Sequence, residues 1–162
     1  MLKTFQHTLN EPVYFKGIGL HTGKIAKLKV VPGKDDQGII FKRIDLSEKN
    51  LISAKYQNVS SAKLCTTLEN EYGTKVSTVE HLLAALYISD IDNATIEIDN
   101  EEVPIMDGSA KDFVEIIKKC GLKSLEGKRQ FVKIKKKIEL KKDYKKINII
   151  PTNGTFDVKF TL

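Results

Sequence analysis

Arginine is scarce in this chain, although basic residues are not. The sequence has 27 lysines and arginines and a net charge of +6 at pH 7, but Arg43 and Arg129 are its only arginines. Bidentate contacts with phosphates and bases favour arginine, and no aromatic-rich RNA-binding motif accompanies the lysines, so we expect no nucleic-acid partner. A solvated lysine surface is favoured. It is also compatible with an anionic partner, such as a nucleotide, or with peripheral contact with the inner membrane surface.

Cysteine is equally rare. Cys65 and Cys120 lie far apart with no Cys-x-x-Cys spacing, which disfavours a disulfide framework and a zinc knuckle. No apolar run approaches the ~20 residues of a membrane-spanning helix. The first five residues also lack the apolar core of a signal peptide. Together these absences predict a cytoplasmic protein.

The order of the predicted elements favours an α+β fold. Strand patterns over residues 13–15, 25–31, 39–43 and 64–69 precede a helix over 77–88, an alternating strand over 94–98 and a second helix after Gly108. The second helix has an apolar stripe, and Gly121 is a natural end for it. Strands followed by helix, strand and helix are typical of α+β proteins rather than doubly wound sheets. The stripe consists of Phe113, Ile116, Ile117 and Cys120.

A new pattern begins near residue 129. Residues 124–128 resemble a linker, and from Val132 to Leu140 apolar residues alternate with lysines. The runs 147–150 and 156–162 read as further strands. About thirty-five residues without a covering helix make a poor domain. We therefore expect a first domain over 1–124 and an incomplete second domain over 129–162.

The segment Ser77-Thr78-Val79-Glu80-His81 permits two interpretations. Ser77 and Glu80 have the spacing of a helix capping box, before an apolar stripe of Val79, Leu82, Leu83 and Leu86. Alternatively, the carboxylate and the neighbouring imidazole could serve a metal-activated water. On a helix, His81 points away from the stripe, beside Ala84 and Ala85. Small residues there indicate that another part of the protein packs closely on that face.

Two further segments are ambiguous in the same way. The glycine-rich run from Gly17 to Gly23 contains His21 but is neither Gly-x-Gly-x-x-Gly nor a P-loop, so it is a hairpin connection or a ligand-binding loop. Asp107 follows a strand and precedes Gly108 and Ser109. It either forms an ordinary turn before a helix capped by Ser109, or orients a neighbouring reactive group.

The histidines do not form a metal motif by themselves. His7, His21 and His81 are the three histidines, and none lies in His-Glu-x-x-His. A catalytic zinc site needs about three protein ligands and an open position. Either no metal binds, or further ligands come from elsewhere.

Three segments, taken together, resemble one family. Residues 17–23, 77–82 and 104–109 resemble, in order, the N-terminal half of the UDP-3-O-acyl-N-acetylglucosamine deacetylases, the zinc amidases of lipid A biosynthesis. Leu64-Cys65-Thr66 and the strands from Phe131 are also similar, so the resemblance covers essentially the whole chain. It implies two similar α+β domains, each a two-layer sandwich of a mostly antiparallel sheet with helices packed on it. The active site would lie between them, with the small face of Ala84 and Ala85 packed against the second domain or its zinc ligands. The second domain would be truncated here.

The resemblance also implies roles. His81 would bind Zn²⁺ and Glu80 would be the general base, while His21, Cys65 and Asp107 would line or support the substrate site. The implied substrate is UDP-3-O-(3-hydroxyacyl)-N-acetylglucosamine, which loses acetate. The family's other zinc ligands and its general acid belong to the second domain, so this chain alone is expected to be inactive. The alternative is a non-catalytic α+β binding module whose basic strand face takes an anionic partner.

Overall fold

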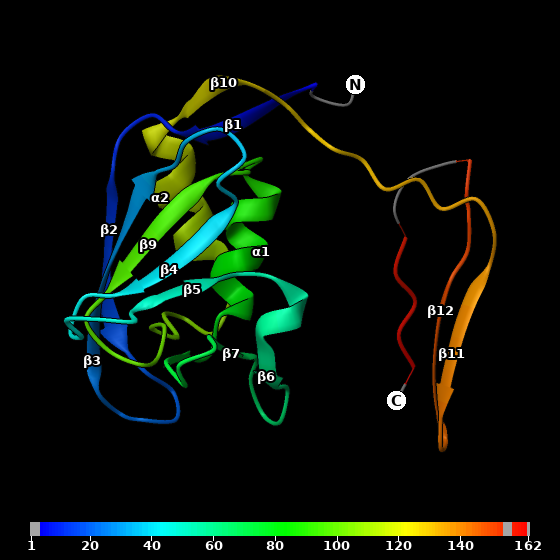
Figure 1. The fold of residues 1–162 in the computed structure, drawn as a ribbon, viewed down its shortest axis with the longest axis horizontal. Coiled ribbons are helices and arrows are strands. Elements are labelled where there is room, and N and C mark those ends of the chain that lie inside the picture. Colours follow the sequence, from blue (N-terminus) through cyan, green and yellow to red (C-terminus); the bar gives the residue numbers. More distant parts are fainter. Residues whose placement is uncertain (1–3, 154–156, 162) are drawn as a thin grey trace. The chain divides into compact units, whose positions relative to one another are not determined.

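The computed structural model describes residues 4–153 and 157–161. It divides into two compact units, one ending at Arg129 and the other beginning at Gln130. Figure 1 shows the helices and strands of the two units. The domain limits expected from the sequence, 1–124 and 129–162, remain a prediction.

A five-stranded sheet is the centre of the first unit. Its order is β2-β3-β9-β4-β5, and every neighbouring pair is antiparallel except β4 and β9, which are parallel. The five strands are β2 (Val13–Ile18), β3 (Ile25–Pro32), β9 (Ala94–Ile98), β4 (Ile39–Arg43) and β5 (Leu51–Ser53).

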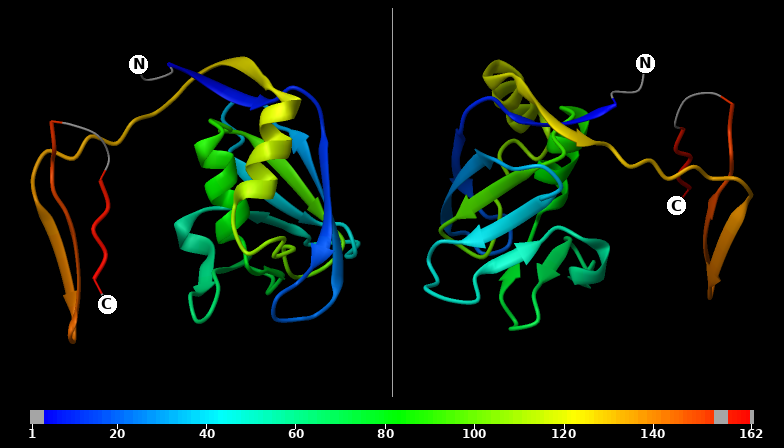
Figure 2. Two further views of the ribbon diagram at one scale, coloured as in Figure 1. Left: turned by 180° about the vertical axis from the view of Figure 1, so that it is seen from behind. Right: turned by 45° about the horizontal axis from the view of Figure 1, so that its top comes forward.

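Two α-helices of the described residues, α1 (Glu80–Ile88) and α2 (Lys111–Cys120), cover one face of this sheet (Figure 2). Alternate residues of the strands point toward them: Ala94, Ile96 and Ile98 of β9 are fully buried. The rings of Phe15 and Phe113 meet with centroids 4.9 Å apart. The α+β prediction is therefore confirmed, with mostly antiparallel sheets.

Two small sheets flank the main one. In the first, β1 (Phe5–Leu9) pairs antiparallel with β10 (Leu122–Lys128). The second contains β6 (Val59–Ser61), β7 (Thr67–Glu69) and β8 (Lys75–Val76), and it follows the 3-10 helix η1 (Tyr56–Asn58). The prediction of a linker over 124–128 is wrong, because these residues belong to β10. Their pairing with β1 gives the backbone donors and acceptors of both strands hydrogen-bond partners.

The face of α1 that enters the core differs from the predicted one. Val79, Leu82 and Leu86 are buried as expected, but Ala85 is fully buried too, whereas Leu83 is only half-buried. Helix α1 contacts α2 and covers the sheet (Figure 2), and Ala85 belongs to the core of the first unit. The expectation that Ala85 packs against something outside the first domain is therefore wrong. Ala84 is exposed.

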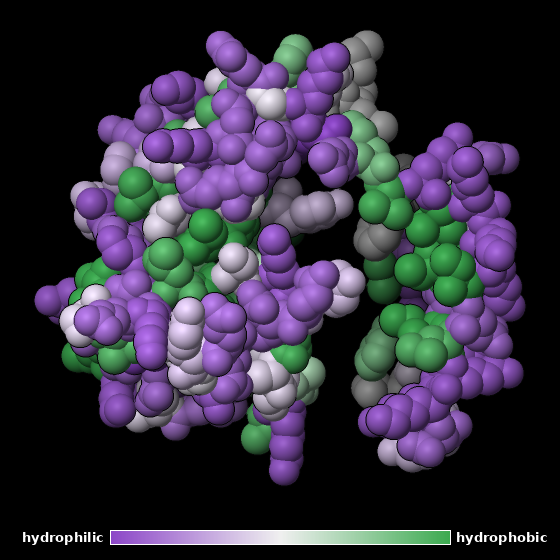
Figure 3. All heavy atoms as spheres, viewed as in Figure 1, coloured by the Kyte–Doolittle hydropathy of each residue, from purple (hydrophilic) through white to green (hydrophobic). Residues whose placement is uncertain are grey.

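The second unit contains a hairpin of β11 (Ile138–Lys142) and β12 (Lys145–Ile149). The strand expected from Val132 begins only at Ile138. Residues 157–161 of the expected last strand have no regular structure, and Phe156 and Leu162 lie outside the described residues. The cross-strand pairs put apolar side chains on one hairpin face (Figure 3). They are Ile138, Leu140, Ile147 and Ile149.

Neither α-helix in the described part of the chain has the length and apolar composition that spanning a membrane requires.

Candidate active site

Three segments that are far apart in the sequence meet just beyond the end of β9. The amide of Ile105 donates to the carbonyl of Ile18 at 3.0 Å, which joins residues 104–109 to the glycine-rich loop. Ser77 donates to the carbonyl of Glu101 at 2.9 Å and accepts from the amide of Val103 at 3.1 Å. The same stretch therefore binds the start of α1. The three sequence motifs form one structural unit.

Glu102 lies where these segments converge, and its side chain is 1% exposed. Its carboxylate accepts hydrogen bonds from the amides of His21 at 2.9 Å and Thr22 at 2.8 Å, and from the hydroxyl of Thr78 at 2.9 Å. Burial raises the pKa of the Glu102 carboxyl, but these donors together with the Thr22 hydroxyl hold that pKa below its ordinary value. Glu102 is therefore a buried, ionised anchor for the site.

The sequence did not point to Glu102. It stands beside Glu101 between a strand and Pro104, where no periodic pattern distinguishes a buried acid from an exposed one. The spacing of Gly17 and Gly19 is the signal that could have found it. A β-carbon on Gly19 would overlap the carboxylate of Glu102, and one on Gly17 would lie 2.9 Å from Cβ of Pro104. These glycines let the loop approach residues 102–104 closely.

Glu80 is the first residue of α1, and its carboxylate does not cap that helix. Oε2 of Glu80 accepts the amide of Thr66 at 3.1 Å. The hydroxyl of Ser77 donates to the carbonyl of Glu101 at 3.2 Å, and the N-cap residue is Val79, without a side-chain cap. The capping-box interpretation is wrong, because residues 77–79 pair with neighbouring segments before the helix begins.

Cys65 lies near Glu80, because the amide of the next residue, Thr66, donates to the Glu80 carboxylate. Besides the bond from Thr66 to Glu80, the amide of Val79 donates to the carbonyl of Thr66 at 3.4 Å. Sγ of Cys65 lies 3.9 Å from Oγ1 of Thr67, and the residue is half-buried. Glu80 and His81 are half-buried as well, so both remain accessible from solvent.

His21 and Asp107 are placed on the exposed rim of this unit. His21 is held through its backbone amide, which donates to Glu102. The carboxylate of Asp107 accepts the hydroxyl of Ser109 at 2.8 Å and its amide at 2.9 Å, and these bonds lower the pKa of Asp107. Asp107 thus shapes the turn before α2.

Backbone strain gathers around the same residues. Seven described residues other than glycine have a positive φ. Three of them are a leucine, a threonine and a methionine, which rarely adopt this conformation, and each stands one or two positions before a predicted site residue. The pairs are Leu64 (φ 69°) before Cys65, Thr78 (φ 56°) before Glu80, and Met106 (φ 53°) before Asp107. Such strain persists only where the surroundings enforce it, and it clusters at functional sites.

A metal would find one nitrogen ligand here. His81 directly follows Glu80 at the start of α1, and an imidazole and a carboxylate are side chains that suit a zinc ligand and a general base. Within residues 4–153 and 157–161, no three histidine, cysteine, aspartate or glutamate side chains form a cluster that could hold a metal ion.

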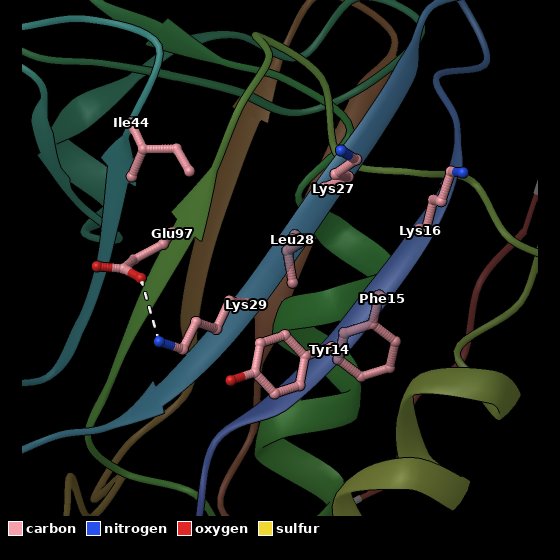
Figure 4. Close-up of a pocket in the computed structure, with 8 residues that line it drawn as sticks. All are labelled: Tyr14, Phe15, Lys16, Lys27, Leu28, Lys29, Ile44 and Glu97. Atoms are coloured by element: carbon pink, nitrogen blue, oxygen red, sulfur yellow. Dashed lines mark ion pairs between the residues drawn. The ribbon is translucent and has the colours of Figure 1, made fainter.

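A separate hollow of about 360 Å³ lies on the sheet face away from α1 (Figure 4). Lys29 forms an ion pair with Glu97 there, with 3.8 Å between Nζ and Oε2, and its ammonium lies over the ring of Tyr14. None of the predicted site residues lines this hollow.

Comparison with known proteins decides the family. Residues 6–162 match the family described as UDP-3-O-acyl N-acetylglycosamine deacetylase. The chain belongs to this deacetylase family. A protein named UDP-3-O-acyl-N-acetylglucosamine deacetylase from Geotalea uraniireducens (strain Rf4) is 44% identical over 159 residues, covering 96% of this chain and 52% of that relative.

Two other relatives give the same result for this deacetylase-family chain. The protein of that name from Wigglesworthia glossinidia brevipalpis is 44% identical over 158 residues, covering 97% of this chain and 51% of the relative. The one from Saccharophagus degradans is 43% identical over 157 residues, with the same coverage of 97% and 51%. The chain thus spans about half the length of the curated relatives that it matches.

Proposed function

We propose that the protein carrying this chain hydrolyses the acetamide of UDP-3-O-(3-hydroxyacyl)-N-acetylglucosamine, with zinc, in lipid A biosynthesis. The observation that carries the proposal is the Glu80–His81 pair at the start of α1, with its carboxylate oriented by the amide of Thr66 at 3.1 Å. Membership of the deacetylase family supports the same reaction.

His81 would hold the metal, and further ligands would come from residues outside this chain. Bound zinc supplies Lewis-acid polarisation and lowers the pKa of a coordinated water toward ~7. The residues present fit this role in part, because a half-buried histidine directly follows a half-buried glutamate whose carboxylate accepts the amide of Thr66. Zinc dependence is therefore part of the proposal.

Glu80 would act as the general base. Its one hydrogen bond found among the described residues is at Oε2, which leaves Oε1 to take a proton from the attacking water. The water oxygen joins the acetyl carbon, the carbon–nitrogen bond breaks, and acetate leaves. The glucosamine nitrogen gains a proton from an acid that we place outside this chain. His21, Cys65 and Asp107 would line or support the substrate site.

The alternative, a binding module with a basic strand face, has less support. On the hairpin of the second unit, Glu139 bonds Lys137, Lys141 and Lys146 at 3.4, 3.2 and 2.7 Å, so part of the positive charge is neutralised. Contact with the inner membrane surface and the cytoplasmic location remain predictions.

The experiment compares this chain with a longer protein that continues past Leu162. The longer protein should release acetate from the UDP-sugar lipid and contain stoichiometric zinc, which His81→Ala should remove. This chain alone should release no acetate and bind zinc weakly. If the longer protein folds and binds the UDP-sugar lipid without releasing acetate, the deacetylase proposal fails in favour of the binding module. Tight zinc in this chain alone would show that its own residues complete a metal site.

A further inference from the structure

Glu102 is the one ionisable side chain among the buried polar residues of the described chain. Burying a carboxylate is costly unless donors satisfy it, so a protein without a use for the charge gains little by keeping it there. The donors here come from two segments, and both of them carry predicted site residues. That arrangement suggests a role beyond filling the core.

One side of Glu102 holds the glycine-rich loop. The amides of His21 and Thr22 both point at the carboxylate, at 2.9 and 2.8 Å. The missing side chain of Gly19 makes room for it. The position of the His21 backbone therefore depends directly on this carboxylate.

The other side of Glu102 holds the residue before the helix. Thr78 is buried, has a φ of 56° and donates its hydroxyl to Oε1 of Glu102 at 2.9 Å. A β-branched residue pays a steric penalty in this conformation, so it needs such contacts to remain there. Because Thr78 stands two residues before Glu80, its backbone angles determine how the chain enters α1.

We propose that Glu102 is the positioning residue of this site. It fixes the backbone of His21 relative to the Glu80–His81 pair by holding His21 and the strained Thr78 on the same carboxylate. The inference deepens the proposed function, since it assigns a role within the same site.

The negative charge is essential to this role. Two amides and the hydroxyls of Thr78 and Thr22 converge on two oxygens, and a neutral amide at this position would turn an NH₂ group toward one of them. Glu102→Gln keeps the shape and volume of the side chain, so it separates the loss of the charge from the loss of packing. Glu101→Gln is the matched control: Glu101 is exposed, and its carboxylate pairs with Lys24 at 3.5 Å.

Amide hydrogen exchange on this chain tests the inference without any assay of activity. Glu102→Gln should reduce protection of the His21 and Thr22 amides roughly tenfold or more, while the amides of β3 and β9 keep theirs. Glu101→Gln should change neither set. Unchanged protection in the loop would overturn the proposal, and so would an equal loss throughout β3 and β9, which marks a general structural role.

A second variant covers the case in which Glu102→Gln does not fold. Thr78→Val keeps the branched shape and removes the hydroxyl bond to Glu102. It should lower protection of the Ser77 and Val79 amides, which bond the neighbouring segments, and leave β3 and β9 unchanged. Unchanged Ser77 and Val79 amides would contradict the role assigned to Thr78 and Glu102.

Steady-state kinetics of the longer protein then test whether the positioning by Glu102 matters for the reaction. Glu102→Gln should lower kcat with little change in KM or zinc content, whereas Glu101→Gln should match the wild type. If Glu102→Gln kept the KM and kcat of the wild type, the proposal that Glu102 positions the site residues would be refuted. If the wild-type longer protein lacks deacetylase activity, the proposed function fails, and the hydrogen-exchange result still decides the role of Glu102.

Discussion

The amide of Thr66 donates a 3.1 Å hydrogen bond to Oε2 of Glu80. The contact joins the turn after Cys65 to the first residue of α1. It directs the carboxylate away from the helix end that it was expected to cap. The tertiary structure thus holds Glu80 in a half-buried position, from which, in the proposed function, it would take a proton from the attacking water.

Glu80→Gln tests this assignment. The amide oxygen of glutamine can still accept the Thr66 bond, but the side chain cannot take a proton. We expect near-native melting of this chain and, in the longer protein, native zinc content with a rate lower by roughly 10²-fold or more. Steady-state kinetics and metal analysis provide the measurement. Retention of most of the activity would mean that the general base lies elsewhere.

Ala85→Lys should destabilise this chain, and Ala84→Lys should not. Ala85 is fully buried between α1 and its neighbours, so a lysine there either buries its ammonium or disrupts the packing. The expected loss is about 2–4 kcal/mol, against less than ~0.5 kcal/mol at the exposed Ala84. Urea unfolding of the two variants makes the comparison. Equal stabilities would show that α1 packs on a different face.

Glu102 should make stability depend on pH. Its pKa is lowered by folding from an ordinary value of 4.5, so its stabilising contribution is complete above about pH 4.5. That contribution is lost as the pH falls through the folded pKa. The fall in melting temperature of the wild type from pH 6 to pH 3 should therefore exceed that of Glu102→Gln. A parallel decline in both proteins would show that the carboxylate is not held in its ionised form.

Arg129 should stabilise the end of the first unit. Its guanidinium bonds Asp92 at 2.8 Å and Asp90 at 3.0 Å, and its amide donates to the carbonyl of Thr4 at 2.9 Å. Arg129→Ala should lower the free energy of unfolding by about 1–3 kcal/mol. Arg129→Lys should recover only part of this, because an ammonium cannot reproduce the planar fork. The neighbouring exposed Lys128→Ala is the control, and a loss equal to that of Arg129→Ala would refute a specific role.

Local sequence patterns predict those elements whose buried face follows from the periodicity of their own side chains. The alternation in 94–98 became β9, and the apolar stripe of 111–120 became α2, ended by Gly121 with its φ of 79°. In both, side-chain periodicity alone selects the buried face. The capping box at Ser77 failed because its hydroxyl found a partner 24 residues away, in Glu101.

The sequence by itself determined the family, the α+β class and the candidate site residues, since motifs and periodicity are properties of neighbouring residues. Only the tertiary structure decided that residues 124–128 form a strand on β1, that Ala85 belongs to the core and that Glu102 joins the loops of the site. Each of these depends on a contact between distant segments. The sequence does not distinguish a buried glutamate from an exposed one. The donors to Glu102 lie 80 and 24 residues away in the chain, and they come within hydrogen-bond distance only when the sheet and its helices have packed.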